Sequence, residues 1–212
     1  MTNFSDLIAG YHRFRENDWN NQRDRWCQLS QGQSPKTMII ACSDSRVDPT
    51  QIFDTSPGEI FVVRNVAALV PPYETGGGYH GVSAALEFAV TQLKVEEIVV
   101  MGHGACGGCK AALERSFDES DFGEGGFIKQ WIELLEPARE AVASQTHETA
   151  HDADIAMEQA GVQVSLVNLR TFPFVAKAEE TGTLKLHGSH FAIETGILHV
   201  LDQASGKFAP AS

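Results

Sequence analysis

The sequence TMIIA (Thr37–Ala41) is the first of three short apolar runs that decide the fold class, and EIFVV (Glu59–Val63) and EIVVM (Glu97–Met101) follow it. Uninterrupted apolar runs of this length are typical of strands that are buried on both faces of a parallel sheet. The amphipathic stretch Gly81–Lys94 (GVSAALEFAVTQLK) lies between the second and third runs and completes a β–α–β unit. The sequence therefore predicts an α/β fold with a mostly parallel central sheet flanked by helices.

The segments outside this unit predict additions to the sheet. From Phe4 to Leu29, apolar side chains recur near helical spacing, so we expect residues 1–30 to form an N-terminal helical arm. Residues 127–180 also follow a helical pattern, whereas the alternating tail Thr183–Leu201 predicts a hairpin or extra strands at the C-terminal edge of the sheet. The expectation is a single domain over residues 1–212.

The composition is that of an acidic globular protein. Sixteen Lys and Arg residues stand against 28 Asp and Glu residues, which gives a formal net charge of −12. Because such a chain repels phosphate backbones, nucleic acid is not expected as its main partner. The sequence contains neither an apolar run long enough for a membrane span nor a secretory signal pattern, so a cytoplasmic location is expected. Four cysteines in such a chain favour metal or redox use over a disulfide framework.

Metal-binding side chains follow the first and third predicted strands. Cys42 comes directly after TMIIA, and the loop GHGACGGC, with His103 and Cys106, follows EIVVM. Sites in parallel sheets form outside the carboxyl ends of the strands, so these two loops are expected to meet. Two thiolates and an imidazole suit zinc and leave a fourth position for water. Asp44 is then placed to point at the metal-bound water, and Arg46 to hold Asp44 by a bidentate pair. The alternative is a buried strand cysteine, with Asp44 capping the next short helix.

The second of these loops also matches two other motifs. Gly102, Gly104 and Gly107 spell G-x-G-x-x-G, a dinucleotide fingerprint, but on the third predicted strand rather than the first. Cys106 and Cys109 spell C-x-x-C, a redox signature. Redox use would leave most of the candidate residues above without a role, so metal binding is the more economical interpretation.

A further zinc motif, H-E-x-x-H, occurs at His147-Glu148-Thr149-Ala150-His151. In a metalloprotease of this type the two histidines lie on one face of a helix, and the glutamate acts as the general base. Polar residues surround the segment here, so we interpret it as a chance match on a solvated helix.

Three blocks of the sequence match the signature of a known family. They are ACSDSR (Ala41–Arg46), VRNVA (Val63–Ala67) and GHGACGG (Gly102–Gly108). In these blocks, and over about residues 36–174, the chain resembles the β-class carbonic anhydrases, and it looks closest to their plant-type branch, in which the zinc site is open.

This resemblance implies a function, a cofactor and an assembly. It implies a zinc lyase that interconverts carbon dioxide and bicarbonate, with Zn²⁺ bound by Cys42, His103 and Cys106 and a catalytic dyad of Asp44 and Arg46. It also implies a homodimer or a higher even oligomer, with the active site at the dimer interface and the arm around the neighbour. Phe88 stands where the family has a tyrosine. The family's substrate pocket maps onto Gln33, Phe61, Val66, Phe88 and Gly107.

Overall fold

The fold is seen in a computed structural model that describes residues 2–76 and 78–211. The chain divides into two compact units, residues up to 34 and residues from 35 onward, and each is described by itself. The expectation of one domain over residues 1–212 stays a prediction.

The N-terminal unit is helical, as its apolar spacing predicts. Asn3 begins the first helix with a capping box, in which its side chain accepts from the Asp6 N–H and the Asp6 carboxylate accepts from the Asn3 N–H. The apolar side chains of this helix are exposed, among them Phe4 at 76% and Leu7 at 59%. The elements of the unit are α1 (Phe4–Phe14), a π-helical turn (Arg15–Trp19) and α2 (Arg23–Leu29).

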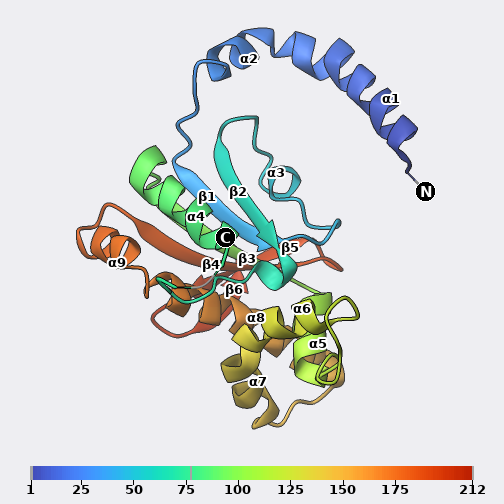
Figure 1. The fold of residues 1–212 in the computed structure, drawn as a ribbon, viewed down its shortest axis with the longest axis vertical. Coiled ribbons are helices and arrows are strands. Elements are labelled where there is room, and N and C mark those ends of the chain that lie inside the picture. The colour runs from blue at the N-terminus through green and yellow to red at the C-terminus, as the bar shows by residue number, and fades with distance from the viewer. Residues whose placement is uncertain (1, 77, 212) are drawn as a thin grey trace. The chain divides into compact units, whose positions relative to one another are not determined.

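Six strands of the second unit form one sheet in the order β2-β1-β3-β4-β5-β6 (Figure 1). Strands β2, β1, β3 and β4 are parallel, whereas β5 and β6 are antiparallel to their neighbours. The three apolar runs that predicted strands are confirmed as β1, β2 and β3. The bounds are β1 (Thr37–Cys42), β2 (Ile60–Asn65), β3 (Glu97–His103), β4 (Lys185–Ala192), β5 (Ile197–Asp202) and β6 (Lys207–Pro210).

The prediction for the C-terminal tail is confirmed, because β4 and β5 form an antiparallel pair that extends the sheet, with their turn between Ala192 and Ile197. Strand β4 also pairs with β3 in the parallel direction and is mostly buried. Helix α8 (Ala150–Leu169) packs closely on this strand, since a Cβ at Gly188 would lie 2.9 Å from the Val162 side chain. The antiparallel edge consists of β5 and β6, and β6 lies beyond the predicted tail.

Helices bury both faces of the sheet, as predicted. Met38 and Ile40 of β1 pack with residues of α4 and α9, while Ile39 and Ala41 pack with residues of α5, α6 and α7. Figure 1 shows α5, α6 and α7 gathered away from α4 and α9. The remaining elements are α3 (Pro49–Ile52), η2 (Val66–Ala68), α4 (Gly81–Glu87), η3 (Phe88–Leu93), α5 (Gly107–Glu114), α6 (Gly126–Ile132), η4 (Glu133–Leu135), α7 (Glu136–Ala143) and α9 (Pro173–Glu180).

None of the helices within residues 2–76 and 78–211 combines the length and the hydropathy that crossing a lipid bilayer requires.

Candidate metal centre

Parallel pairing of β1 and β3 brings the first two candidate ligands to the same edge of the sheet. Ala41 of β1 pairs with Met101 of β3, so Cys42 and His103 both end their strands at this edge. The chain then turns at Ala105, whose φ of 54° lies in the left-handed region. That conformation costs a non-glycine residue about 1 kcal/mol, and it directs the chain into α5, with Cys106 as the N-cap.

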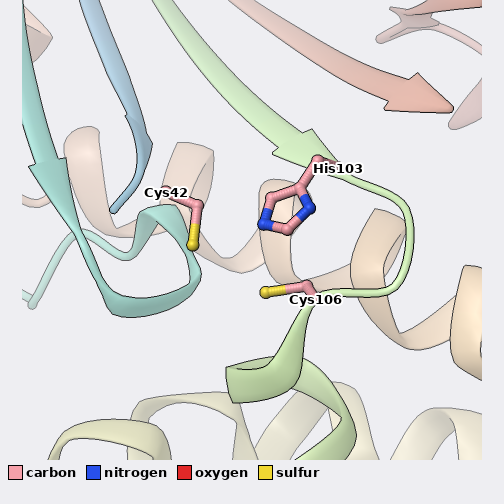
Figure 2. Close-up of side chains that lie close together, drawn as sticks. All are labelled: Cys42, His103 and Cys106. Carbon is pink, nitrogen blue, oxygen red and sulfur yellow. The ribbon is translucent and has the colours of Figure 1, made fainter. Parts of the chain in front are cut away.

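Cys42, His103 and Cys106 form a compact group that can hold a metal ion (Figure 2). All three are buried, and their ligand atoms lie within 4.8 Å of one another. His103 Nδ1 lies 2.9 Å from the Gly104 carbonyl oxygen, so it carries the proton and donates, which leaves a lone pair on Nε2. Nε2 is buried and has no hydrogen-bond partner among the described residues. A metal ion bound by this lone pair and the two thiolates would satisfy it.

The two thiols hold their protons tightly while no metal is bound. The hydrogen bond with Cys106, followed by burial, raises the pKa of Cys42 to about 12. The hydrogen bond with Cys109 is the main cause that raises the pKa of Cys106, also to about 12. Since thiolates are the ligand form, metal uptake at neutral pH must release protons from this pair.

Asp44 lies beside the group and is fixed by Arg46. Asp44 Oδ1 accepts from the backbone N–H and from Nε of Arg46, each at 2.9 Å, and Oδ2 accepts from Nη2 at 2.6 Å. These bonds hold the pKa of Asp44 well below its usual range, so the carboxyl is ionised. Arg46 Nη2 also donates to the Ala105 carbonyl at 3.0 Å, which ties the pair to the loop that carries Cys106.

Two further charged side chains, Arg64 and Glu158, stabilise this loop region. The sequence did not indicate this role for either of them. Arg64 donates to the carbonyl oxygens of Cys42 and Asp44, at 2.8 and 2.6 Å, and pairs with Asp48. Glu158 of α8 is buried and accepts from the Cys106 N–H at 3.0 Å. Arg64 lies in a signature block of the sequence, whereas no local pattern marks Glu158.

The comparisons with known proteins agree with this geometry. Residues 37–198 match the family model described as carbonic anhydrase. A carbonic anhydrase of Pseudomonas aeruginosa is 38% identical over 203 residues, which cover 96% of this chain and 90% of that protein. This chain belongs to the β-carbonic anhydrase family.

Solved structures of β-carbonic anhydrases share the fold. CcaA superposes with a TM-score of 0.91 at 33% identity, over 98% of this chain and 92% of that chain. A tetrameric β-carbonic anhydrase of Sordaria macrospora superposes with a TM-score of 0.79 at 29% identity, over 99% of this chain and 98% of that chain. The predicted family and fold class are therefore confirmed.

The positions expected to form the carbonic anhydrase substrate pocket are partly brought together. The rings of Phe61 and Phe88 lie 6.0 Å apart, and Val66 follows β2 directly. Val66 packs closely on α5, because a Cβ at Gly108 would lie 2.8 Å from its side chain. Gln33 belongs to the N-terminal unit, so its place in the pocket stays a prediction.

The competing H-E-x-x-H motif does not lie on a single helix in the structure. His147 and Glu148 precede α8, because Thr149 caps that helix through a capping box with Asp152, and His151 lies inside it. The prediction that one solvated helix carries the whole H-E-x-x-H segment is therefore wrong. Among the described residues, the Cys42 group is the one set of three or more His, Cys, Asp or Glu side chains with ligand atoms this close.

The alternative role considered for Asp44 is also excluded. The short helix α3 is capped by Asp48, whose side chain accepts from the Thr50 N–H at 2.9 Å. Asp44 makes its bonds to Arg46 instead.

Exchange of single cysteines tests the metal-binding group. Cys106→Ser should lose the ability to retain added zinc through dialysis, because a hydroxyl is a poor replacement for a thiolate ligand. Cys109→Ser should retain about one zinc per chain, since Cys109 lies outside the three-residue group. Elemental analysis of both variants measures this. Equal loss of metal would place Cys109 among the ligands and contradict the assignment.

Proposed function

We propose that this β-carbonic anhydrase performs the reversible hydration of carbon dioxide to bicarbonate and a proton at one zinc ion, held by Cys42, His103 and Cys106. The observation that carries the proposal is the group itself, two buried thiols and an unpartnered imidazole nitrogen within 4.8 Å of one another. When bound there, zinc lowers the pKa of water at its open position, which in carbonic anhydrases with three histidine ligands brings that pKa to about 7. Two thiolate ligands donate more negative charge, so the lowering should be smaller here.

Asp44 orients the attacking water. Its carboxylate is ionised and therefore only accepts hydrogen bonds, and each oxygen has two lone pairs. Oδ2 receives a hydrogen bond from Arg46 Nη2, and its second lone pair can accept from the water. The bidentate guanidinium stops the carboxylate from rotating, which keeps this acceptor in a fixed direction. Arg46 is thus a positioning residue for Asp44.

The pocket for carbon dioxide is apolar, with one polar contact. Phe61, Val66 and Phe88 suit an uncharged substrate that makes few hydrogen bonds. Gly107 is the first residue of α5, and the N–H groups of a first helical turn have no partner within the helix. This N–H can stabilise negative charge that develops on a substrate oxygen. Phe88 has no hydroxyl to add to these contacts.

We assign the chain to the plant-type branch, in which the zinc site is open. Both Asp44 oxygens are engaged by Arg46. Arg64 is already paired with Asp48 and two carbonyl oxygens, so a bicarbonate ion beside it would have to compete for its N–H groups. Ile39, which pairs with Val62 two residues before Arg64, has no hydrogen-bonding side chain to offer such an ion.

The proposed dimer, or higher even oligomer, rests on apolar surface that one subunit leaves exposed. Val66 and Phe88 of the substrate pocket are 40% and 44% exposed. The apolar side chains of α1 are also exposed, and the Sordaria macrospora relative is tetrameric. A second subunit would bury these surfaces.

Four free cysteines fit a reducing compartment, so we also propose a cytoplasmic location, which cell fractionation tests.

The catalytic proposal is tested by Asp44→Asn. The amide is isosteric but uncharged, so it pairs weakly with Arg46 and presents donors where the carboxylate accepts. We expect turnover of carbon dioxide hydration to fall at least about 10²-fold while zinc stays bound. Stopped-flow hydration rates and elemental analysis measure the two quantities. Asp121→Asn, in an exposed loop, is the matched control and should leave both unchanged. Full activity in Asp44→Asn would show that the Asp44–Arg46 pair has only a structural role.

The assembly is tested on α1 by sedimentation velocity. Leu7→Glu places a charge on the exposed apolar face and should shift the oligomer toward smaller species. Arg13→Glu introduces the same residue near the end of the same helix and should leave the oligomer intact. A wild-type monomer at micromolar concentration would contradict the proposed dimer.

A further inference from the structure

Cys109 belongs to a sequence motif that the metal centre uses only in part. Cys106 and Cys109 spell C-x-x-C, and of these two residues only Cys106 belongs to the metal-binding group. The two thiols are nevertheless hydrogen-bonded to each other. Both cysteines are free and buried, with exposed fractions of 3% and 4%. The candidate metal centre is therefore in direct contact with a second thiol.

The start of α5 explains why these two side chains meet. Cys106 is the N-cap of this helix, and Cys109 is its third residue. The side chain of an N-cap lies beside the third residue of its helix, as in a capping box. The Lys110 N–H donates to the Cys106 carbonyl oxygen at 3.0 Å, so the first helical turn closes on Cys106. A spacing of two residues within this turn brings the two sulfur atoms together.

Helix α8 packs against both cysteines. Glu158 accepts from the Cys106 N–H at 3.0 Å, and a Cβ at Gly161 would lie 3.7 Å from Cys109 Sγ. Residues three apart in sequence lie on the same face of a helix, so both cysteines face one side of α8. The same Cβ would lie 3.1 Å from the Leu135 side chain, which shows how closely the helices approach here. Such packing restricts Cys109 to its place beside Cys106.

Metal binding fixes the direction of the hydrogen bond between the thiols. A cysteine that binds a metal ion does so as a thiolate, which can only accept hydrogen bonds. Cys109 belongs to the apolar cluster that also contains Leu135 and Met157, where a charge would be costly, so it keeps its proton. Cys109 Sγ–H is then the donor and Cys106 Sγ the acceptor. A thiol is a weak donor, but a bond to an ionised acceptor is roughly twice as strong as a bond between neutral groups.

We propose that Cys109 is a positioning residue of the metal centre, which donates a hydrogen bond to the Cys106 thiolate and draws negative charge from it. A thiolate that shares a lone pair with a donor gives less charge to the metal ion, which then polarises its bound water more strongly. Cys109 thus partly offsets the effect of two thiolate ligands. This consequence for catalysis rests on the proposed function, whereas the hydrogen bond itself does not.

Cobalt(II) in place of zinc tests the hydrogen bond without any measurement of activity. The thiolate-to-cobalt charge-transfer absorption responds to the charge on the sulfur atom. Cys109→Ala removes the donor, whereas Cys109→Ser keeps a donor at nearly the same side-chain size, so the two variants differ by one hydroxyl group. Absorption spectra of the full-length, cobalt-loaded protein should show the band at longer wavelength in Cys109→Ala. In Cys109→Ser the band should stay at the wild-type wavelength or lie at a shorter one.

The pH dependence of carbon dioxide hydration is a second readout. In the zinc-loaded enzyme, the midpoint of the pH profile of kcat/KM should rise by roughly half a pH unit in Cys109→Ala, which corresponds to a fraction of one hydrogen bond. In Cys109→Ser the midpoint should not rise. Stopped-flow rates across the pH range measure this shift.

The two readouts separate this proposal from the proposed function. Identical spectra of the wild type and Cys109→Ala would refute the role of Cys109. Equal shifts to longer wavelength in both variants would also refute it, because both lose the sulfur atom and only one loses the donor. Absence of any thiolate-to-cobalt band in the wild type would contradict the metal ligands themselves. Absence of carbon dioxide hydration would contradict the proposed function, while the cobalt spectra would still decide the role of Cys109.

Discussion

The parallel pairing of β1 with β3 is the constraint on which the metal centre depends. It places Cys42 and His103 at the ends of neighbouring strands, at one edge of the sheet. The left-handed turn at Ala105 then returns the chain within three residues, so that Cys106 joins them from the N-terminus of α5. A slip of one residue between the two strands would move these side chains to opposite faces and destroy the group. Register here is protected because both faces of β1 are buried.

The protein fixes this geometry with bonds to the backbone as well as with packing. Arg64 holds the chain at Cys42 and Asp44 through their carbonyl oxygens, and Glu158 holds the Cys106 N–H. Arg46 links the two loops directly, because it bonds both to Asp44 and to the Ala105 carbonyl. Ligands that are held before the metal arrives lose less conformational entropy on binding it, so these supports favour a tight and well-oriented site.

The sequence predicts the parts of this structure that depend on local pattern and misses those that depend on long-range packing. Strands β1, β2 and β3, the metal-binding group and the Asp44–Arg46 pair follow from short apolar runs and from the residues that end them. The parallel pairing of β4 with β3 does not, because the alternating sequence predicts added strands without giving their partner or direction. Glu158 lies 52 residues after Cys106 in the sequence, and nothing near it signals their bond.

The central claim is that zinc is held by Cys42, His103 and Cys106 while Asp44 remains with Arg46. A crystal structure of the zinc-loaded enzyme near pH 7.5, with anomalous data at the zinc absorption edge, tests it most directly. We predict one zinc ion between the three side chains, a water in the fourth position, and Asp44 still in its bidentate pair. Zinc bound elsewhere, or Asp44 coordinated directly to zinc with its bonds to Arg46 broken, would contradict this claim.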